Sequence, residues 1–146
     1  MIACEAGQDD GSSTAGAIGV YGALRVASPS NVPGARDSAV SWIDSSGNLW
    51  LFGGGVPNPD GSFNVFNDLW EFNPTTKEWT WMSGAEDATG VYGTQGVPAA
   101  ANVPVVRWCA VSWIDSSGNL WLFGGQQPSP GTYIAFVLND LWRYQP

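Results

Sequence analysis

The chain has 146 residues, the size of one ordinary domain, and its thirteen Asp and Glu against five Lys and Arg give a net charge of −8. So few cations argue against a nucleic-acid partner and against an anionic membrane surface, because both need clustered Lys and Arg. The sequence has no His, which excludes Ser-His-Asp nucleophiles and His-bound zinc, and it has no apolar run long enough to span a membrane.

A duplicated unit organises the sequence. Residues 39–54 read AVSWIDSSGNLWLFGG, and residues 110–125 read the same, so the offset is 110 − 39 = 71. Shorter matches flank this segment: 19–22 with 90–93, 31–33 with 102–104, Arg36 with Arg107, and 67–70 with 139–142. We therefore divide the chain into an N-terminal segment (1–18), a first repeat (19–89) and a second, incomplete repeat (90–146).

Each repeat is predicted to be a series of short strands. In the first repeat, residues 39–43 are β-branched and aromatic, an Asp-Ser-Ser-Gly-Asn turn follows, and residues 49–52 return, which predicts a hairpin. After a loop, a third and a fourth strand are predicted at 68–72 and 78–82. No 3.6-residue apolar period persists, so no helix is expected.

The return strand carries apolar residues without alternation, as Leu-Trp-Leu-Phe. Because successive side chains of a strand point to opposite faces, both faces of the sheet are expected to be covered. A four-stranded antiparallel sheet with two covered faces, repeated in tandem, is how the blades of a β-propeller stack.

The repeats resemble the kelch repeats of bacterial, galactose-oxidase-like β-propellers. The likeness rests on an Arg before the first strand, a Gly-Gly pair after the second and a Trp in the fourth. These residues are Arg36, Gly53, Gly54 and Trp79 in the first repeat and Arg107, Gly124 and Gly125 in the second. The resemblance implies an all-β fold with two kelch-type four-stranded antiparallel blades per chain, of which the second lacks its own fourth strand. It also implies a mainly structural role for the two Arg.

Two blades are fewer than the about four to eight that close a propeller. A free pair leaves two apolar outer faces, so we expect either a homo-oligomer, as a ring or a filament, or a fragment of a larger kelch-propeller protein or enzyme. In an assembly, residues 1–6 are expected to supply the missing strand to a neighbour, and the alternative is a frayed terminus.

Ligand binding is expected in the loops, where aromatic and amide side chains suit glycans or peptides. For each aromatic residue the alternative is packing between blades. Asp44 and Asp115 are candidate calcium ligands, and the alternative is that they only stabilise their turns. Asp68 and Asp140 could form a catalytic carboxylate pair, and the alternative is that they only begin their strands. The candidate ligand-binding residues are Asn58, Asp60, Phe63, Tyr92, Trp108, Gln126, Gln127 and Tyr133.

The two cysteines, Cys4 and Cys109, are too few for a disulfide framework. A bridge between them remains open, as does Cys109 as a small buried apolar residue. Residues 1–4, Met-Ile-Ala-Cys, also resemble the end of a bacterial lipoprotein cleavage site, without the basic and apolar regions that should precede it.

Together these observations predict a non-enzymatic, extracellular or bacterial cell-surface propeller module without a cofactor. It is expected to self-associate through blade faces and strand exchange, and to bind protein or glycan through its loops. The alternatives are a structural filament subunit and a fragment of a larger kelch-propeller protein or enzyme. The galactose oxidases that the repeats resemble imply a copper site with His and a Cys-linked Tyr, which a chain without His does not build.

Overall fold

The computed structural model describes residues 18–58, 63–85, 89–128 and 135–146. These residues form eleven strands, paired antiparallel, and none of them is helical. The all-β fold class predicted from the repeats is confirmed. It follows that this part of the chain has no helix long and apolar enough to cross a bilayer.

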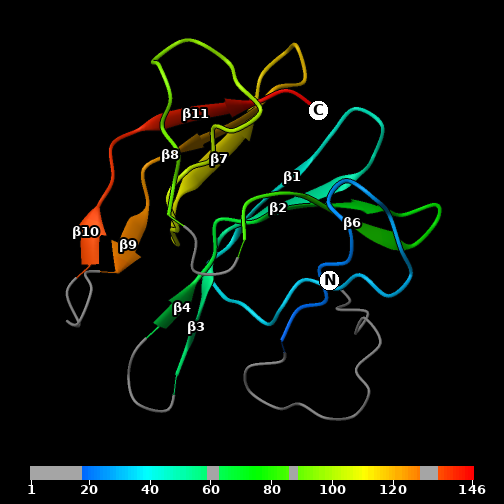
Figure 1. The fold of residues 1–146 in the computed structure, drawn as a ribbon. Coiled ribbons are helices and arrows are strands. Elements are labelled where there is room, and N and C mark those ends of the chain that lie inside the picture. The colour runs from blue at the N-terminus through cyan, green and yellow to red at the C-terminus, as the bar shows by residue number, and fades with distance from the viewer. Residues whose placement is uncertain (1–17, 59–62, 86–88, 129–134) are drawn as a thin grey trace, which may run out of the picture.

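The first repeat forms a four-stranded sheet, which we call blade 1 (Figure 1). Its β1–β2 turn closes through a bond from the Asp44 N–H to the Asn48 carbonyl (3.0 Å), and Gly47 supplies the positive φ of 85°. The predicted strands agree with the observed ones to within one residue at each end. In spatial order they are β1 (Val40–Ile43), β2 (Leu49–Phe52), β5 (Leu69–Asn73) and β6 (Glu78–Ser83).

The second repeat forms a three-stranded sheet, blade 2, from β7 (Val111–Ile114), β8 (Leu120–Phe123) and β11 (Leu141–Tyr144). The order β11-β8-β7 leaves β11 at the edge. Within the described residues, blade 2 therefore lacks the counterpart of β6, as the repeat pattern predicted.

Two small hairpins stand where the sequence predicted only loops. The first pairs β3 (Gly55–Pro57) with β4 (Phe63–Val65), and the second pairs β9 (Gln126–Pro128) with β10 (Ala135–Val137). They project from the same end of the two blades, away from the C-terminus (Figure 1). The loop prediction missed them because their Pro, Gly and Asn content hides short strands whose pairing satisfies backbone groups.

The identical segments bury opposite faces in the two blades. Strand pairing defines a Trp face, with Val40, Trp42, Trp50 and Phe52 in blade 1 and Val111, Trp113, Trp121 and Phe123 in blade 2. The reverse side is the Leu face, with Leu49 and Leu51 in blade 1 and Leu120 and Leu122 in blade 2. Trp42 is 7% exposed but its equivalent Trp113 is 43% exposed, whereas Leu49 is 40% exposed and its equivalent Leu120 is 2% exposed.

This reversal shows that the Trp face of blade 1 packs on the Leu face of blade 2. The Trp42 indole N–H donates to the Trp121 carbonyl (3.2 Å), and the rings of Trp50 and Tyr144 lie 5.2 Å apart. The hydrophobic core is this seam between the blades. The Leu face of blade 1 and the Trp face of blade 2 point outward.

Backbone bonds also join the two repeats. The Gly54 N–H donates to the Arg107 carbonyl (2.9 Å), and the Cys109 N–H donates to the Ser38 carbonyl (3.0 Å). Cys109 has a positive φ of 54° and is exposed, so its interpretation as a buried apolar residue is wrong. Cys4 lies outside the described residues, as do residues 1–6.

Candidate functional site

In each blade one Arg binds one Asp through two hydrogen bonds, an arrangement that we call the Arg–Asp clip. Arg36 binds both carboxylate oxygens of Asp68, at 2.6 and 2.8 Å, and Arg107 binds those of Asp140 at 2.6 and 2.7 Å. Each guanidinium also donates to the first carbonyl of its Gly-Gly pair, at 3.0 Å in blade 1 and 2.9 Å in blade 2. The four charged groups are thus engaged within their own blades.

An indole and a phenol complete each clip. Asp68 accepts bonds from the Trp70 indole and the Tyr21 hydroxyl, both at 2.7 Å. Asp140 accepts the same bonds from Trp142 at 2.6 Å and from Tyr92 at 2.7 Å. Although burial raises the pKa of Asp140, the bonds from Arg107, Trp142 and Tyr92 outweigh it and hold that pKa well below its usual range.

The Asp44 and Asp115 carboxylates are occupied by their own turns. Asp44 accepts the N–H groups of Ser46 and Asn48 at 2.9 and 3.0 Å and the Trp50 indole at 2.9 Å. Asp115 makes the equivalent bonds, and those from Asn119 and Trp121 lower its pKa to about 2. Nowhere in the described ranges do three His, Cys, Asp or Glu gather as metal ligands.

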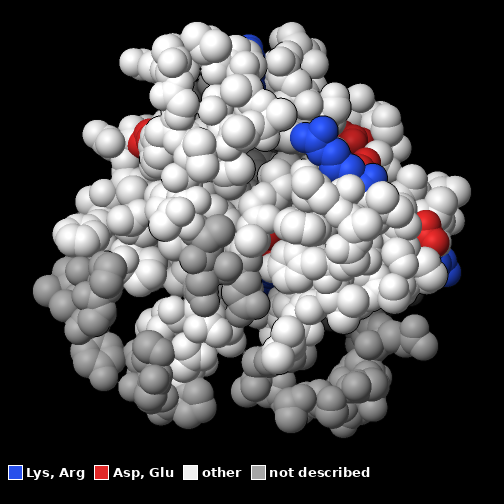
Figure 2. Space-filling view, viewed as in Figure 1, with Lys and Arg blue, Asp and Glu red and all other residues white. Residues whose placement is uncertain are grey.

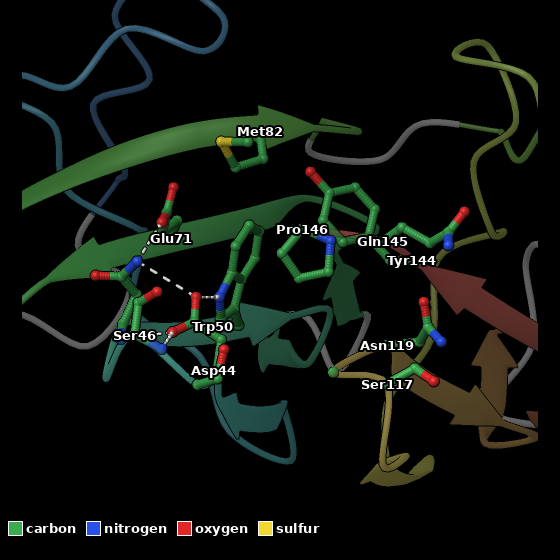
Figure 3. Close-up of a pocket in the computed structure, with 13 residues that line it drawn as sticks. Asp44, Ser46, Trp50, Glu71, Met82, Ser117, Asn119, Tyr144, Gln145 and Pro146 are labelled. Atoms are coloured by element: carbon green, nitrogen blue, oxygen red, sulfur yellow. Dashed lines mark hydrogen bonds between the residues drawn. The ribbon is translucent and has the colours of Figure 1, made fainter.

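A cleft of about 440 Å³ opens between the blades at the end that carries these turns. Figure 3 shows blade 1 on one side and the C-terminal residues on the other. The volume is in the range of small-molecule sites. The lining of the cleft includes Asp44, Asn48, Trp50, Glu71, Asn119 and Tyr144.

Two carboxyl groups of the cleft have opposite pKa shifts. The Asn48 amide donates to Glu71 at 2.8 Å and to Asp44 at 3.3 Å, so it bridges them (Figure 3). Desolvation and the nearby Asp44 charge raise the pKa of Glu71. Burial alone would raise the pKa of Asp44, but the bonds from Trp50, Asn48 and Ser46 lower it overall. Such a divided pair can keep one carboxylate ionised while the other exchanges a proton.

One aromatic ring flanks this pair. Trp50 is 2% exposed and packs on Tyr144, so it supports the half-buried Tyr144 ring, which suits the apolar face of a sugar, while the carboxyl and amide groups suit its hydroxyls. Burial raises the pKa of Tyr144, the charge of Arg25 opposes that shift and the charge of Glu71 adds to it. Most of the face in Figure 2 is uncharged, but one basic patch there lies directly beside an acidic one.

The carboxyl pair occurs in blade 1 and is not repeated in blade 2. At the offset of 72, the position of Glu71 is taken by Arg143, whose guanidinium lies 5.8 Å from the centre of the Trp121 ring. Our sequence reasoning did not single out Glu71. A difference between the two repeats at a strand position was the signal that could have found it.

Most of the predicted loop residues lie elsewhere, at the hairpin end. Phe63 stacks on Trp108 at 5.8 Å and 20°, which packs one repeat against the other, and Trp108 pairs with Gln126. Gln127 follows on β9, and the Asn58 amide donates to Asn64 at 2.8 Å. Tyr92 belongs to the blade 2 clip instead. Asp60 and Tyr133 lie outside the described residues.

Comparison with known proteins finds relatives that match part of the chain. No family model matches it. The N-acetylneuraminate epimerases of Escherichia coli (strain K12) and Shigella sonnei (strain Ss046) are each 49% identical over 47 residues, which is 32% of this chain and 12% of theirs. The solved "Structure of YjhT" is 28% identical with a TM-score of 0.46, over 66% of this chain and 23% of that one.

These relatives correct one prediction. The chain was expected to be non-enzymatic, but the curated proteins that it matches carry the name of an enzyme, so that expectation is wrong. The lack of His excludes His-dependent nucleophiles and metal sites, yet acid–base chemistry needs only carboxyl groups. The chain spans 12% of the length of these relatives, and the homology supports a kelch-type propeller relationship over the matched part.

Proposed function

We propose that this chain forms two consecutive blades of a larger kelch-type propeller enzyme that acts on N-acetylneuraminate or a related sugar acid. The relatives supply the substrate class. The observation that carries the proposal is the Asp44–Asn48–Glu71 arrangement, in which neighbouring carboxyl groups have opposite pKa shifts beside a sugar-sized cleft.

Epimerisation requires a bond at one carbon to break and re-form with proton transfer, which is work for a general acid and base. Glu71 is suited to that transfer because its pKa is raised toward neutral pH. Asp44 stays ionised, and the half-buried Tyr144 provides a ring surface for the sugar.

The test measures binding and interconversion of N-acetylneuraminate epimers by proton NMR with the full chain. Glu71→Gln keeps an acceptor for Asn48 but no longer exchanges a proton, so we expect the catalysed rate to fall about 10²–10⁴-fold. Glu78→Gln, which changes a carboxyl on β6 outside the cleft lining, should leave the rate unchanged. A chain that does not bind the sugar, or a Glu71→Gln chain as fast as the unaltered one, would contradict the proposal.

Self-association is a second proposal, favoured by the reversed burial of the two blades. The exposed Leu face of blade 1 and the exposed Trp face of blade 2 have the composition of the two surfaces that meet inside the chain. The outward face of one blade can therefore pack on the complementary face of a further blade, and such head-to-tail packing closes as a ring or extends as a filament. Further blades of a longer chain or other copies of this one would cover them.

A further inference from the structure

The two Asp-Ser-Ser-Gly-Asn turns are a matched pair, of which only one adjoins a second carboxyl group. In both turns the Asp carboxylate accepts the N–H groups two and four residues further on, at 2.9 and 3.0 Å. Both turns also close through a bond from the Asp N–H to the Asn carbonyl, at 3.0 Å in blade 1 and 3.1 Å in blade 2. None of these bonds uses the Asn side chain, so the turn forms without it.

The two Asn side chains bind differently. In blade 2 the Asn119 amide donates to the Asp115 carboxylate at 2.8 Å, and it makes no other hydrogen bond within the described residues. In blade 1 the Asn48 amide lies 3.3 Å from the Asp44 carboxylate and 2.8 Å from Oε1 of Glu71, on β5. The shorter bond of Asn48 therefore leaves its own turn and reaches a different strand.

The two carboxylate oxygens of Glu71 are not equivalent. Glu71 pairs with Trp50 across β5 and β2, so its side chain lies on the Trp face of blade 1, inside the seam between the blades. Oε1 accepts the Asn48 amide, whereas none of the described residues donates a hydrogen bond to Oε2. One oxygen is thus anchored, and the other is left for a group that enters the cleft.

The ionisable groups around Glu71 come from two other elements. Burial, and then the charge of Asp44 on the β1–β2 turn, raises the pKa of Glu71. Tyr144 on β11 is the other neighbour, because the charge of Glu71 acts on its pKa, as does that of Arg25. The Asn48 amide has two N–H donors and does not titrate, so it can bind both carboxyl groups without adding charge.

We propose that Asn48 is the positioning residue of the carboxyl pair: its amide anchors Glu71 through Oε1, holds it apart from Asp44 and leaves Oε2 to exchange a proton with the bound sugar acid. This inference rests on the proposed function for its substrate. The proton passes from a sugar hydroxyl to Oε2 and is returned to the sugar, so Glu71 ends each cycle as it began.

The first experiment follows the Glu71 carboxyl directly, without sugar. Carbon NMR of a chain labelled with ¹³C at its four Glu side chains is recorded against pH, and Glu71→Gln identifies the signal. Asn48→Ala should raise the pKa of Glu71 and lower its acid dissociation constant about ten-fold, because the ionised carboxylate loses its donor. Asn119→Ala removes the matched amide of blade 2 and should leave this titration unchanged.

The second experiment separates positioning from binding. With N-acetylneuraminate as substrate, Asn48→Ala should lower kcat about ten-fold near pH 7 and change KM less than about two-fold. The acid limb of its pH profile should move upward together with the Glu71 titration. Asn48→Ser keeps a single donor, so its effects should lie between those of the unaltered chain and Asn48→Ala.

Three results would overturn the proposal. One is a Glu71 titration that Asn48→Ala does not change, another is an equal change in Asn119→Ala, and a third is a raised KM with unchanged kcat. Urea unfolding checks that each variant is folded, and Asn48→Ser replaces Asn48→Ala if the latter does not unfold cooperatively. A chain that shows the NMR difference but does not convert the sugar would contradict only the enzyme proposal.

Discussion

At the level of single residues, the two Arg–Asp clips share their geometry but differ in how far water reaches the carboxylate. Both Asp accept a forked pair of bonds from Arg, and both accept an indole and a phenol. The side chain of Asp68 is 0% exposed and that of Asp140 is 20% exposed. A carboxylate that water can reach tolerates the loss of its partner better than a dry one.

This difference predicts unequal costs for removing the two Arg. Arg36→Met should lower the free energy of unfolding by about 3–5 kcal/mol because it leaves a fully buried carboxylate without a counter-charge. Arg107→Met should cost less, since Asp140 retains some hydration. Urea titration of both variants checks the order, and an equal or larger loss for Arg107→Met would contradict it.

The lowered pKa of Asp115 predicts a pH dependence. Its folded pKa of about 2 lies below the ordinary 3.8, so ionised Asp115 stabilises the fold above about pH 4, and this contribution is lost as pH falls through about 2. Asp115→Asn removes the titrating group. The difference in Tm between the unaltered chain and this variant should therefore shrink over that window. A constant difference would show that Asp115 does not titrate as proposed.

At the level of elements, the Gly-Gly pairs end the second strand of each blade and turn the chain into a hairpin. Gly53 and Gly124 have nearly the same positive φ, 67° and 66°. A Cβ on Gly53 would lie 2.6 Å from the Arg107 carbonyl oxygen, whereas one on Gly124 would lie 3.0 Å from that of Leu138. The first contact crosses from blade 1 to blade 2, so the same motif has an added role in the first repeat.

Substitution of these two glycines separates that role from backbone strain. Each Ala variant should lose about 1–2 kcal/mol because a side chain disfavours the left-handed region. Gly53→Ala should lose about 1 kcal/mol more, since its Cβ forces the repeats apart. Thermal unfolding of the matched pair gives the comparison, and equal losses would mean that the inter-repeat contact yields without cost.

At the level of the whole molecule, the outward Trp face of blade 2 and the outward Leu face of blade 1 make the pair an open-ended stack. Val111 on the first of these is 58% exposed, and Trp113 and Phe123 on the same face are 43% and 41% exposed. Burial of one large apolar side chain contributes about 1.5–3 kcal/mol, so several on each face drive association.

A charge placed on the outward Trp face should oppose that association. Val111→Glu is expected to weaken it at least about ten-fold, because a carboxylate would have to be buried against the next blade. Val137→Glu is the control, since Val137 is 80% exposed but lies on the β9–β10 hairpin rather than on a blade. Light scattering over a range of concentrations measures both. A chain that stays monomeric throughout, or equal effects of the two variants, would contradict the prediction.

Much of the fold could be predicted because the duplication marks its own elements. The Asp-Ser-Ser-Gly-Asn turns set the hairpins, and the third strands follow from the Asn-Asp-Leu-Trp matches. These are local features, dictated by turn chemistry and strand alternation. The β3–β4 and β9–β10 hairpins were missed because short paired segments rich in Pro and Gly carry little local signal.

The candidate site could not be predicted from local features of the sequence. Glu71 has its raised pKa because folding brings Asp44 and Asn48, some twenty-five residues earlier, to its side and removes water. By itself the sequence predicted that the chain is all-β and duplicated, and the three-stranded blade 2 of the described residues agrees with the shorter second repeat. Only the tertiary structure decided which face of two identical segments is buried, because burial depends on the neighbour a surface meets and not on the residues that compose it.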